Sequence, residues 1–275
     1  RSMKKSMTQR FYYSIASGSS GNCGLYMCGS TAILIDLGVS LRKITTALRE
    51  VGLSLDRIAG VVITHDHTDH IKGLPMFLKK SQAPVYASAE TALALHLKQT
   101  APEGRLTTFE PGERFGIGEI GVTPFDTPHD AAGSVGYILS NGDTRFGFAT
   151  DLGFVPGEIA DQLRGCDAVV LESNHDPHML AAGPYPYMLK QRVGGPRGHL
   201  SNPDCAVCAA ELVKSGTRTL ILAHLSEHNN MPALALQQTQ LAIKGLAPCA
   251  VYIAPRERMD APIVLEGGVQ CSLYD

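Results

Sequence analysis

The run from Thr64 to His70, T-H-D-H-T-D-H, holds the side chains best suited to metal chemistry. His65 and His67 are two positions apart. In an extended or tightly turned backbone such residues point to the same side, so both imidazoles can bind one ion. Asp69 and His70 lie one turn further on and can face a neighbouring ion. The run directly follows an apolar segment, where so many grouped polar side chains need a compensating partner. It therefore predicts a metal site rather than a solvated polar loop.

Three further candidate ligands, His129, Asp151 and His224, each come just after a segment expected to be a strand. One strand-end histidine is a weak signal, because such a residue is more often a surface or capping residue. The recurrence is informative, because side chains at the same edge of a sheet converge on one place. We therefore expect these three residues to complete the metal site.

The elements that position these side chains are predicted from apolar periodicity, with short apolar runs indicating strands and amphipathic patterns indicating helices. The expected strands are 11–17, 24–28, 31–36, 58–64, 84–87, 106–109, 120–127, 135–139, 145–149, 168–172, 219–223 and 251–254. The expected helices are 40–51, 71–80, 88–99, 203–214 and 233–244. Residues 174–198 are expected to form a long loop, of the kind that often acts as a lid or binding loop.

Two β-rich halves, each with its own helices, predict an α/β fold of the αββα sandwich type. We find no linker or low-complexity segment, so residues 1–275 are expected to form a single domain. The net charge is −2, so no global field attracts nucleic acid, and any polyanion must bind through a local patch or a metal.

The bulk features indicate a cytoplasmic protein. No apolar run approaches the roughly 20 residues of a membrane span, and the basic N-terminus has no apolar stretch behind it to suggest a signal peptide. The seven cysteines are scattered and odd in number, which favours reduced thiols. Cys205 and Cys208 form a C-x-x-C pair in an expected helix, with no second pair to complete a zinc site. We expect them to pack in the core.

These motifs resemble the metallo-β-lactamase superfamily, whose hallmark is H-x-H-x-D-H followed by a later His, Asp and His. Within that superfamily the chain is similar to the YycJ/WalJ-type exonucleases over almost its whole length. The segments that carry this similarity are Gly18–Asn22, Thr64–Leu74, Thr127–Ala131, Ala149–Gly153, Leu171–Asp176, Gly183–Pro186, Gly198–Asn202 and Ala223–Asn230.

The resemblance implies a site for two divalent metal ions, with zinc expected and manganese or iron as alternatives. It implies that one ion is held by His65, His67 and His129, and that the other is held by Asp69, His70 and His224. Asp151 would bridge the two ions, and Asp36 would lie behind the ligands.

Glu172 and His199 match positions that assist proton transfer and contact the scissile phosphate in tRNase Z-like phosphodiesterases. The alternatives are a structural salt bridge for Glu172 and a helix-entry role for His199. Ser201 and Asn202 follow directly and are expected to bind substrate or to cap the next helix.

A local cationic edge is expected beside His199, within the long loop. It consists of Lys190, Arg192 and Arg197, which either bind substrate phosphates or simply solvate the loop.

Two ions about 3.5–4 Å apart can share a hydroxide, so hydrolysis at neutral pH needs no protein nucleophile. No G-x-S-x-G motif competes for that role. We expect Asp69 to orient the hydroxide, and His199 either to protonate the leaving oxygen or to stabilise charge on it.

The resemblance implies a 5′-to-3′ exonuclease whose partner is DNA. Asp151 and His224 are only 73 residues apart, which leaves no room for the extra domain of β-CASP nucleases. Alternatives are a small-molecule or cyclic phosphodiesterase, a thioesterase or lactamase-type hydrolase, and a metal-binding protein without activity. No membrane partner is expected.

Overall fold

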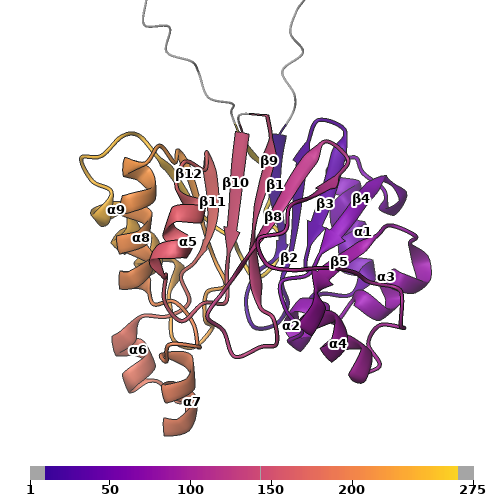
Figure 1. Ribbon diagram of the computed structural model, residues 1–275. Helices are drawn as coiled ribbons and strands as arrows, with labels where there is room; N and C mark the ends of the chain where they lie inside the picture. The colour runs from indigo at the N-terminus through magenta and orange to yellow at the C-terminus, as the bar shows by residue number, and fades with distance from the viewer. Residues whose placement is uncertain (1–9, 143, 266–275) are drawn as a thin grey trace, which may run out of the picture.

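Two seven-stranded sheets pack against each other in the computed structural model, which describes residues 10–142 and 144–265 (Figure 1). The first sheet has the order β14-β1-β2-β3-β4-β5-β6 and the second β13-β12-β11-β10-β9-β8-β7. The first is made of β1 (Arg10–Ala16), β2 (Cys23–Cys28), β3 (Thr31–Ile35), β4 (Ile58–Val62), β5 (Val85–Ser88), β6 (Thr107–Phe109) and β14 (Ile263–Val264). The second is made of β7 (Phe115–Ile117), β8 (Ile120–Asp126), β9 (Val135–Asn141), β10 (Thr144–Ala149), β11 (Ala168–Glu172), β12 (Thr219–Ala223) and β13 (Ala250–Ile253).

Helices cover the outer side of each sheet, which confirms the predicted αββα sandwich (Figure 1). On the first sheet these are α1 (Leu41–Glu50), α2 (Thr68–Ile71), α3 (Leu74–Lys80) and α4 (Ala89–Leu97), with the short 3-10 helix η1 (Leu55–Arg57) before β4. On the second they are α5 (Gly157–Leu163), α8 (Asn202–Lys214) and α9 (Pro232–Ala242). Two short helices, α6 (Pro177–Ala182) and α7 (Tyr187–Val193), extend below the second sheet.

Side-chain caps explain where α1 and α8 begin. The Ser40 hydroxyl accepts a hydrogen bond from the Lys43 backbone N–H at 3.3 Å at the start of α1, and Ser201 does the same for Asp204 at 3.2 Å at the start of α8. Such caps satisfy backbone donors that have no partner inside the helix.

The sequence prediction was wrong at three kinds of place. The helix expected at 71–80 is interrupted, because a turn at residues 72–73 separates the end of α2 from the start of α3. The loop expected at 174–198 contains α6 and α7, which are too short to show a clear apolar period. For the same reason α5, β7 and β14 were not predicted.

The core lies mainly between the two sheets. Tyr26 of β2 stacks on Phe146 of β10 with ring centroids 4.7 Å apart, so the sheets are in direct contact. A second apolar cluster beneath α8 buries Cys205 and Cys208, which confirms that this pair packs in the core. The six cysteines of the described residues are free, and burial raises the pKa of the Cys208 thiol to about 12. Cys271 lies outside the described residues.

The strands that matter for the site run parallel, so their carboxyl ends meet at one edge. Asp36, His65, Asp151, Glu172 and His224 lie at or just after the ends of β3, β4, β10, β11 and β12. β3 pairs in parallel with β4, and β11 with both β10 and β12. Within the described ranges, no helix has the length and apolarity needed to span a bilayer.

Gly38, in the segment after β3, packs closely against the backbone of Asp69 in the run from Thr64 to His70. A Cβ at this position would lie 1.6 Å from the Asp69 carbonyl oxygen, so we expect Gly38→Ala to destabilise the protein by about 3 kcal/mol. Urea unfolding measures this change. The matched control is Gly116→Ala, since a Cβ on Gly116 of β7 meets nothing within 4 Å. Equal stability of the two variants would contradict the expectation.

Candidate metal centre

All seven predicted ligands come together at the lower edge of the sandwich, between the two sheets. Their side chains form overlapping groups in which every candidate ligand atom lies within 4.8 Å of the others. The groups are His65 with His67 and His129; Asp69 with His70 and His224; and His65 with His70 and Asp151. A fourth group joins Asp151 and His224 to Glu172 and His199.

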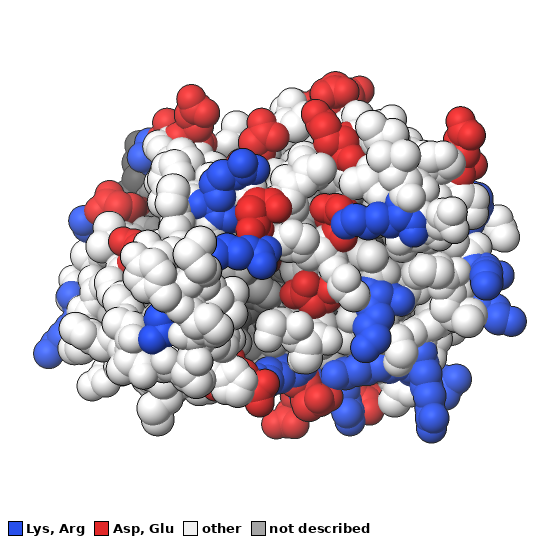
Figure 2. Space-filling view, turned by 90° about the horizontal axis from the view of Figure 1, so that it is seen from below, with Lys and Arg blue, Asp and Glu red and all other residues white. Residues whose placement is uncertain are grey.

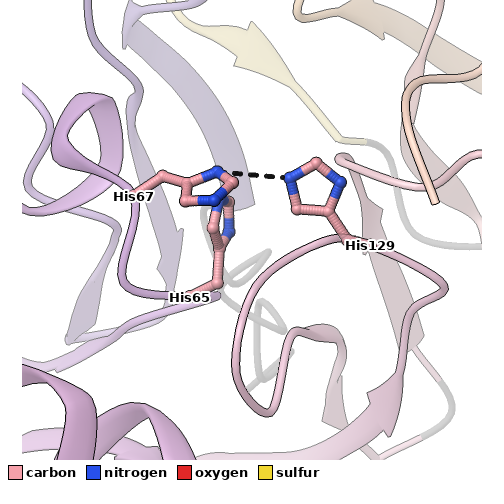
Figure 3. A group of neighbouring side chains, drawn as sticks. All are labelled: His65, His67 and His129. Atoms are coloured by element: carbon pink, nitrogen blue, oxygen red, sulfur yellow. Dashed lines mark hydrogen bonds between the residues drawn. The ribbon is translucent and has the colours of Figure 1, made fainter. Parts of the chain in front are cut away.

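Three imidazoles from two segments form the first group (Figure 3). The Nδ1 atom of His67 and the Nε2 atom of His129 are 3.3 Å apart and face each other across a narrow space. The His65 ring lies edge-on to both, with centroids 4.6 Å from His67 and 5.0 Å from His129. Three nitrogens arranged in this way can bind one cation.

The second group lies beside the first, and Asp151 is placed between them. Asp69 Oδ2 is 3.5 Å from His70 Nε2 and 3.6 Å from His224 Nε2. Asp151 Oδ2 is 3.5 Å from His70 Nε2, whereas its Oδ1 is 3.8 Å from His129 Nε2. One carboxylate therefore faces both groups, as a bridging ligand must.

The histidine rings are oriented by partners on their outer nitrogens. Nδ1 of His70 donates to Asp36 Oδ2 at 2.8 Å, that of His129 to the Gly198 carbonyl oxygen at 3.0 Å, and that of His224 to Glu172 Oε1 at 2.8 Å. An imidazole that donates through Nδ1 keeps its Nε2 lone pair for a metal, and such partners fix ring and tautomer together.

The atoms left without partners match what a cation would bind. His65 Nε2, His224 Nε2 and Asp151 Oδ2 are buried and have no hydrogen-bond partner. Buried polar atoms are almost always paired in proteins, so three orphans that face one space require an explanation. Imidazole nitrogen and carboxylate oxygen are ligands that zinc and related divalent ions accept. The residues present therefore fit a metal centre.

Backbone strain is concentrated at the same strand ends. Asp36, Asp151 and His224 adopt left-handed backbone conformations with φ of 62°, 58° and 58°. In non-glycine residues each such conformation costs on the order of 1–3 kcal/mol and tends to occur at functional sites. The turn redirects each side chain from the end of its strand into the shared space.

Electrostatics acts differently on the individual residues of the site. At His70 the carboxylates of Asp151 and Asp36 outweigh the effect of burial and raise the pKa to about 10, whereas His65 and Asp69 are held in forms that can bind a cation. Burial, together with the neighbouring imidazoles of His70, His129 and His67, lowers the pKa of His65 well below its usual value, so its ring is neutral. Burial alone would raise the pKa of the Asp69 carboxyl. The neighbouring imidazoles of His224 and His70, whose Nε2 atoms lie 3.6 and 3.5 Å from its Oδ2, outweigh this and hold that pKa below its ordinary value.

Glu172 is fully buried and touches the site only through other residues. Its Oε2 accepts from the backbone N–H groups of Leu152 and Leu200, each at 3.0 Å. Its Oε1 accepts from Nδ1 of His199 and of His224, each at 2.8 Å. Burial would raise the pKa of Glu172, but these two imidazoles outweigh it and keep the carboxyl ionised. Glu172 is thus a positioning residue with no surface for a substrate.

His199 has a different environment. Its side chain is 21% exposed and lines the cavity, while Glu172 holds its Nδ1. This leaves Nε2 available to a molecule in the cavity.

Ser201 and Asn202 form the start of α8, Ser201 as its N-cap and Asn202 as its first residue. Ser201 caps the helix and donates to Asp204 Oδ2 at 2.6 Å. Asn202 is fully buried, accepts from the Ser173 hydroxyl at 2.7 Å and donates to Asn230 Oδ1 at 2.8 Å. Its amide therefore has no exposed surface to offer a substrate.

The three cationic side chains predicted to form one edge beside His199, those of Lys190, Arg192 and Arg197, lie in different places. Arg192 lines the cavity at the metal groups and pairs through Nε with Asp130 Oδ2. Arg197 donates to the His129 carbonyl oxygen at 2.9 Å, and Lys190 lines a separate cavity on the other side of α7.

Sequence reasoning assigned no role to Asn22, Thr64 and Asp130. Asn22 Nδ2 donates to Asp69 Oδ2 at 3.1 Å, and the Thr64 hydroxyl donates to Asp36 Oδ2 at 2.8 Å. Asp130 Oδ1 is 3.7 Å from His67 Nε2. The available signal was position alone, since Thr64 and Asp130 adjoin predicted ligands and Asn22 ends the Gly-Ser-Ser-Gly turn.

A cavity of about 220 Å³ opens onto both ligand groups. His67, Asp69, Asp151, His199 and His224 line it together with residues of α7. The face that carries it is hollowed near its centre, with acidic and basic side chains mixed around the hollow rather than a continuous basic surface (Figure 2).

Known proteins are similar to this chain in architecture and in sequence. Residues 31–225 match the family model described as beta-lactamase superfamily domain. The chain is 36% identical to the exodeoxyribonuclease YycJ of Bacillus anthracis over 80% of this chain and 84% of that protein. It is 34% identical to the exodeoxyribonuclease WalJ of Streptococcus pneumoniae serotype 2 (strain D39) over 82% and 85%. The solved metallo-beta-lactamase fold protein YhfI of Bacillus subtilis shares the fold, with a TM-score of 0.71 at 17% identity over 91% and 98% of the two chains.

Replacing Glu172 should weaken the metal centre although no metal ligand is replaced. In Glu172→Gln one half of the side chain becomes a donor, so backbone N–H or imidazole N–H groups lose their acceptor. We expect metal affinity to fall about 10- to 100-fold and the protein to lose about 1–3 kcal/mol of stability. Competition with a chromophoric chelator and urea unfolding measure the two effects. Glu211→Gln, on the exposed face of α8, is the matched control. Unchanged metal affinity in Glu172→Gln would refute the positioning role.

Proposed function

The chain belongs to the metallo-β-lactamase superfamily and to its YycJ/WalJ family, and is therefore a metal-dependent hydrolase; we propose that it is a 5′-to-3′ DNA exonuclease. The observation that carries the proposal is His199, held by a buried carboxylate beside two adjoining groups of metal ligands. Phosphodiester cleavage needs both charge neutralisation and a proton donor for the leaving oxygen, and this arrangement supplies both. The two YycJ and WalJ relatives are named exodeoxyribonucleases.

We propose that two divalent ions occupy the centre, with zinc expected and manganese or iron accepted by the same ligand types. One would be held by His65, His67 and His129, the other by Asp69, His70 and His224, and Asp151 would contact both. When bound, such a pair neutralises phosphate charge and lowers the pKa of water, so that hydrolysis proceeds near neutral pH without a protein nucleophile.

Two side chains of this protein would act on protons. Asn22 and the neighbouring imidazoles hold Asp69 at the cavity wall, where its carboxylate can accept a hydrogen bond from the attacking water and orient it. His199 offers Nε2 to the leaving oxygen and can donate a proton there. Glu172 orients the His199 ring, because its Oε1 accepts a hydrogen bond from His199 Nδ1 at 2.8 Å.

Arg192 is the cation best placed to hold a substrate phosphate. It lines the cavity, and its pairing with Asp130 uses Nε, so the terminal guanidinium nitrogens remain free to make paired hydrogen bonds to phosphate oxygens. Because the net charge is −2, local contacts of this kind and the ions must provide the attraction for DNA.

A cytoplasmic location and a single domain are parts of the same proposal. The free cysteines, five of them buried, suit a reducing compartment. The two sheets share one core, which supports one folding unit. A second candidate function is hydrolysis of a small or cyclic phosphodiester, favoured by the size of the cavity, about 220 Å³, and by the mixed charge around it.

Short single- and double-stranded DNA and RNA, labelled at the 5′ end, test the proposal when incubated with zinc, manganese or magnesium. A 5′-to-3′ exonuclease releases the labelled mononucleotide as its first product, whereas the opposite polarity leaves a ladder of labelled fragments. Asp69→Ala should lower the rate at least about 100-fold, and Asp161→Ala, on the exposed side of α5, should leave it unchanged. Hydrolysis of a cyclic phosphodiester without action on any strand would replace the proposal with the second candidate.

A further inference from the structure

The cavity of about 220 Å³ at the two ligand groups, called the catalytic cavity below, has an apolar lining in one part. Tyr185, Leu189 and Val193 contribute it, whereas the metal-ligand segments contribute polar side chains. A phosphate and two ions require only the polar part. The apolar part therefore indicates that the substrate carries an uncharged group next to the scissile phosphate.

Helix α7 explains why these side chains share one wall. Leu189, Arg192 and Val193 are spaced i, i+3, i+4, so they lie on one face of the helix, and all three line the catalytic cavity. Tyr187 and Lys190 lie on the other side and line a separate cavity of about 780 Å³. Helix α7 thus lies between the two cavities, and its rotation about its own axis decides which side chains line the catalytic cavity.

Tyr185 is the one aromatic side chain other than histidine that lines the catalytic cavity in the part of the chain that the structure describes. It is half-buried, and its ring has an edge-on contact with His228, with centroids 6.0 Å apart. Tyrosine rings near a nucleic-acid site stack on bases, which strengthens binding about 5- to 150-fold per base and tolerates any base.

We propose that the cavity holds one unpaired nucleotide next to the scissile phosphate, with its base stacked on Tyr185; this inference rests on the proposed exonuclease function. The cavity of about 220 Å³ has one aromatic side chain in its apolar part, which suits a single stacked base. Leu189 and Val193 would contact the same base or its sugar, and Arg192 the neighbouring phosphate. The preferred substrate is then a single-stranded or frayed end, because a paired end must first be opened at an energetic cost.

The test uses single-stranded DNA labelled at the 3′ end, intact or lacking the base at the first or the second 5′ nucleotide. The metal-loaded wild type is compared with Tyr185→Ala, Tyr185→Phe and Tyr187→Ala. KM and kcat are measured on cleavable strands, and Kd on strands whose first linkages are hydrolysis-resistant phosphorothioates. Tyr187→Ala is the matched control, since Tyr187 is two residues away, 71% exposed and on the other side of α7.

For the wild type, loss of the base at one of the two positions should raise KM and Kd about ten-fold. Tyr185→Ala should bind the intact strand about ten-fold more weakly and show no further effect of base loss. Tyr185→Phe and Tyr187→Ala should behave as the wild type. The inference is overturned if base loss has no effect at either position, or if its effect persists in Tyr185→Ala. If the wild type cleaves no strand, the proposed function fails, and Kd still decides whether a base is bound.

Circular dichroism and urea unfolding show whether Tyr185→Ala is folded. If it is not, Tyr185→Leu takes its place, because leucine keeps the apolar volume and removes the stacking surface. A persistent effect of base loss in Tyr185→Leu overturns the inference in the same way.

Discussion

The buried carboxylate of Glu172 connects the loops on which one half of the site depends. It lies at the end of β11 and accepts hydrogen bonds from the Leu152 N–H next to Asp151, from the Leu200 N–H next to His199, and from the rings of His199 and His224. Four donors on one carboxylate fix three separate segments relative to one another. A charge in the core is tolerated only with such full compensation, so the loss of any donor affects the other segments too.

The first sheet uses the same device at the end of β3. Asp36 accepts from the Thr64 backbone N–H and hydroxyl and from Nδ1 of His70, so it joins the segment after β4 to the His70 ring. Each sheet thus contributes one buried carboxylate behind the ligands and leaves the imidazole Nε2 atoms turned inward. The site is assembled only when the sheets meet, because its two ligand groups draw on both halves of the chain.

The sequence could predict the parts of the site that depend on local spacing or on strand ends. His65 and His67 are recognisable because two imidazoles two positions apart can share an ion, and His129 because it follows a strand. Asn22 could not be assigned a role, since its contact with Asp69 spans 47 residues. The register of α7 was equally hidden: a helix of seven residues shows too little periodicity to tell which side of it faces the reaction. A residue that stabilises the start of a helix and one that contacts substrate also look alike in sequence. Only the complete burial of Asn202 in the structure shows that its side chain does not contact substrate.

We propose that a pair of metal ions held between the two sheets drives the cleavage of DNA. The most direct test of this proposal is to strip the protein of metal with a chelator and to add back zinc or manganese in known amounts. Metal binding and mononucleotide release are followed in the same samples. We expect two tightly bound ions per chain and a rate that reaches its plateau only at the second equivalent of metal. Full activity of the metal-free protein, or a plateau reached with one ion bound per chain, would contradict the proposal.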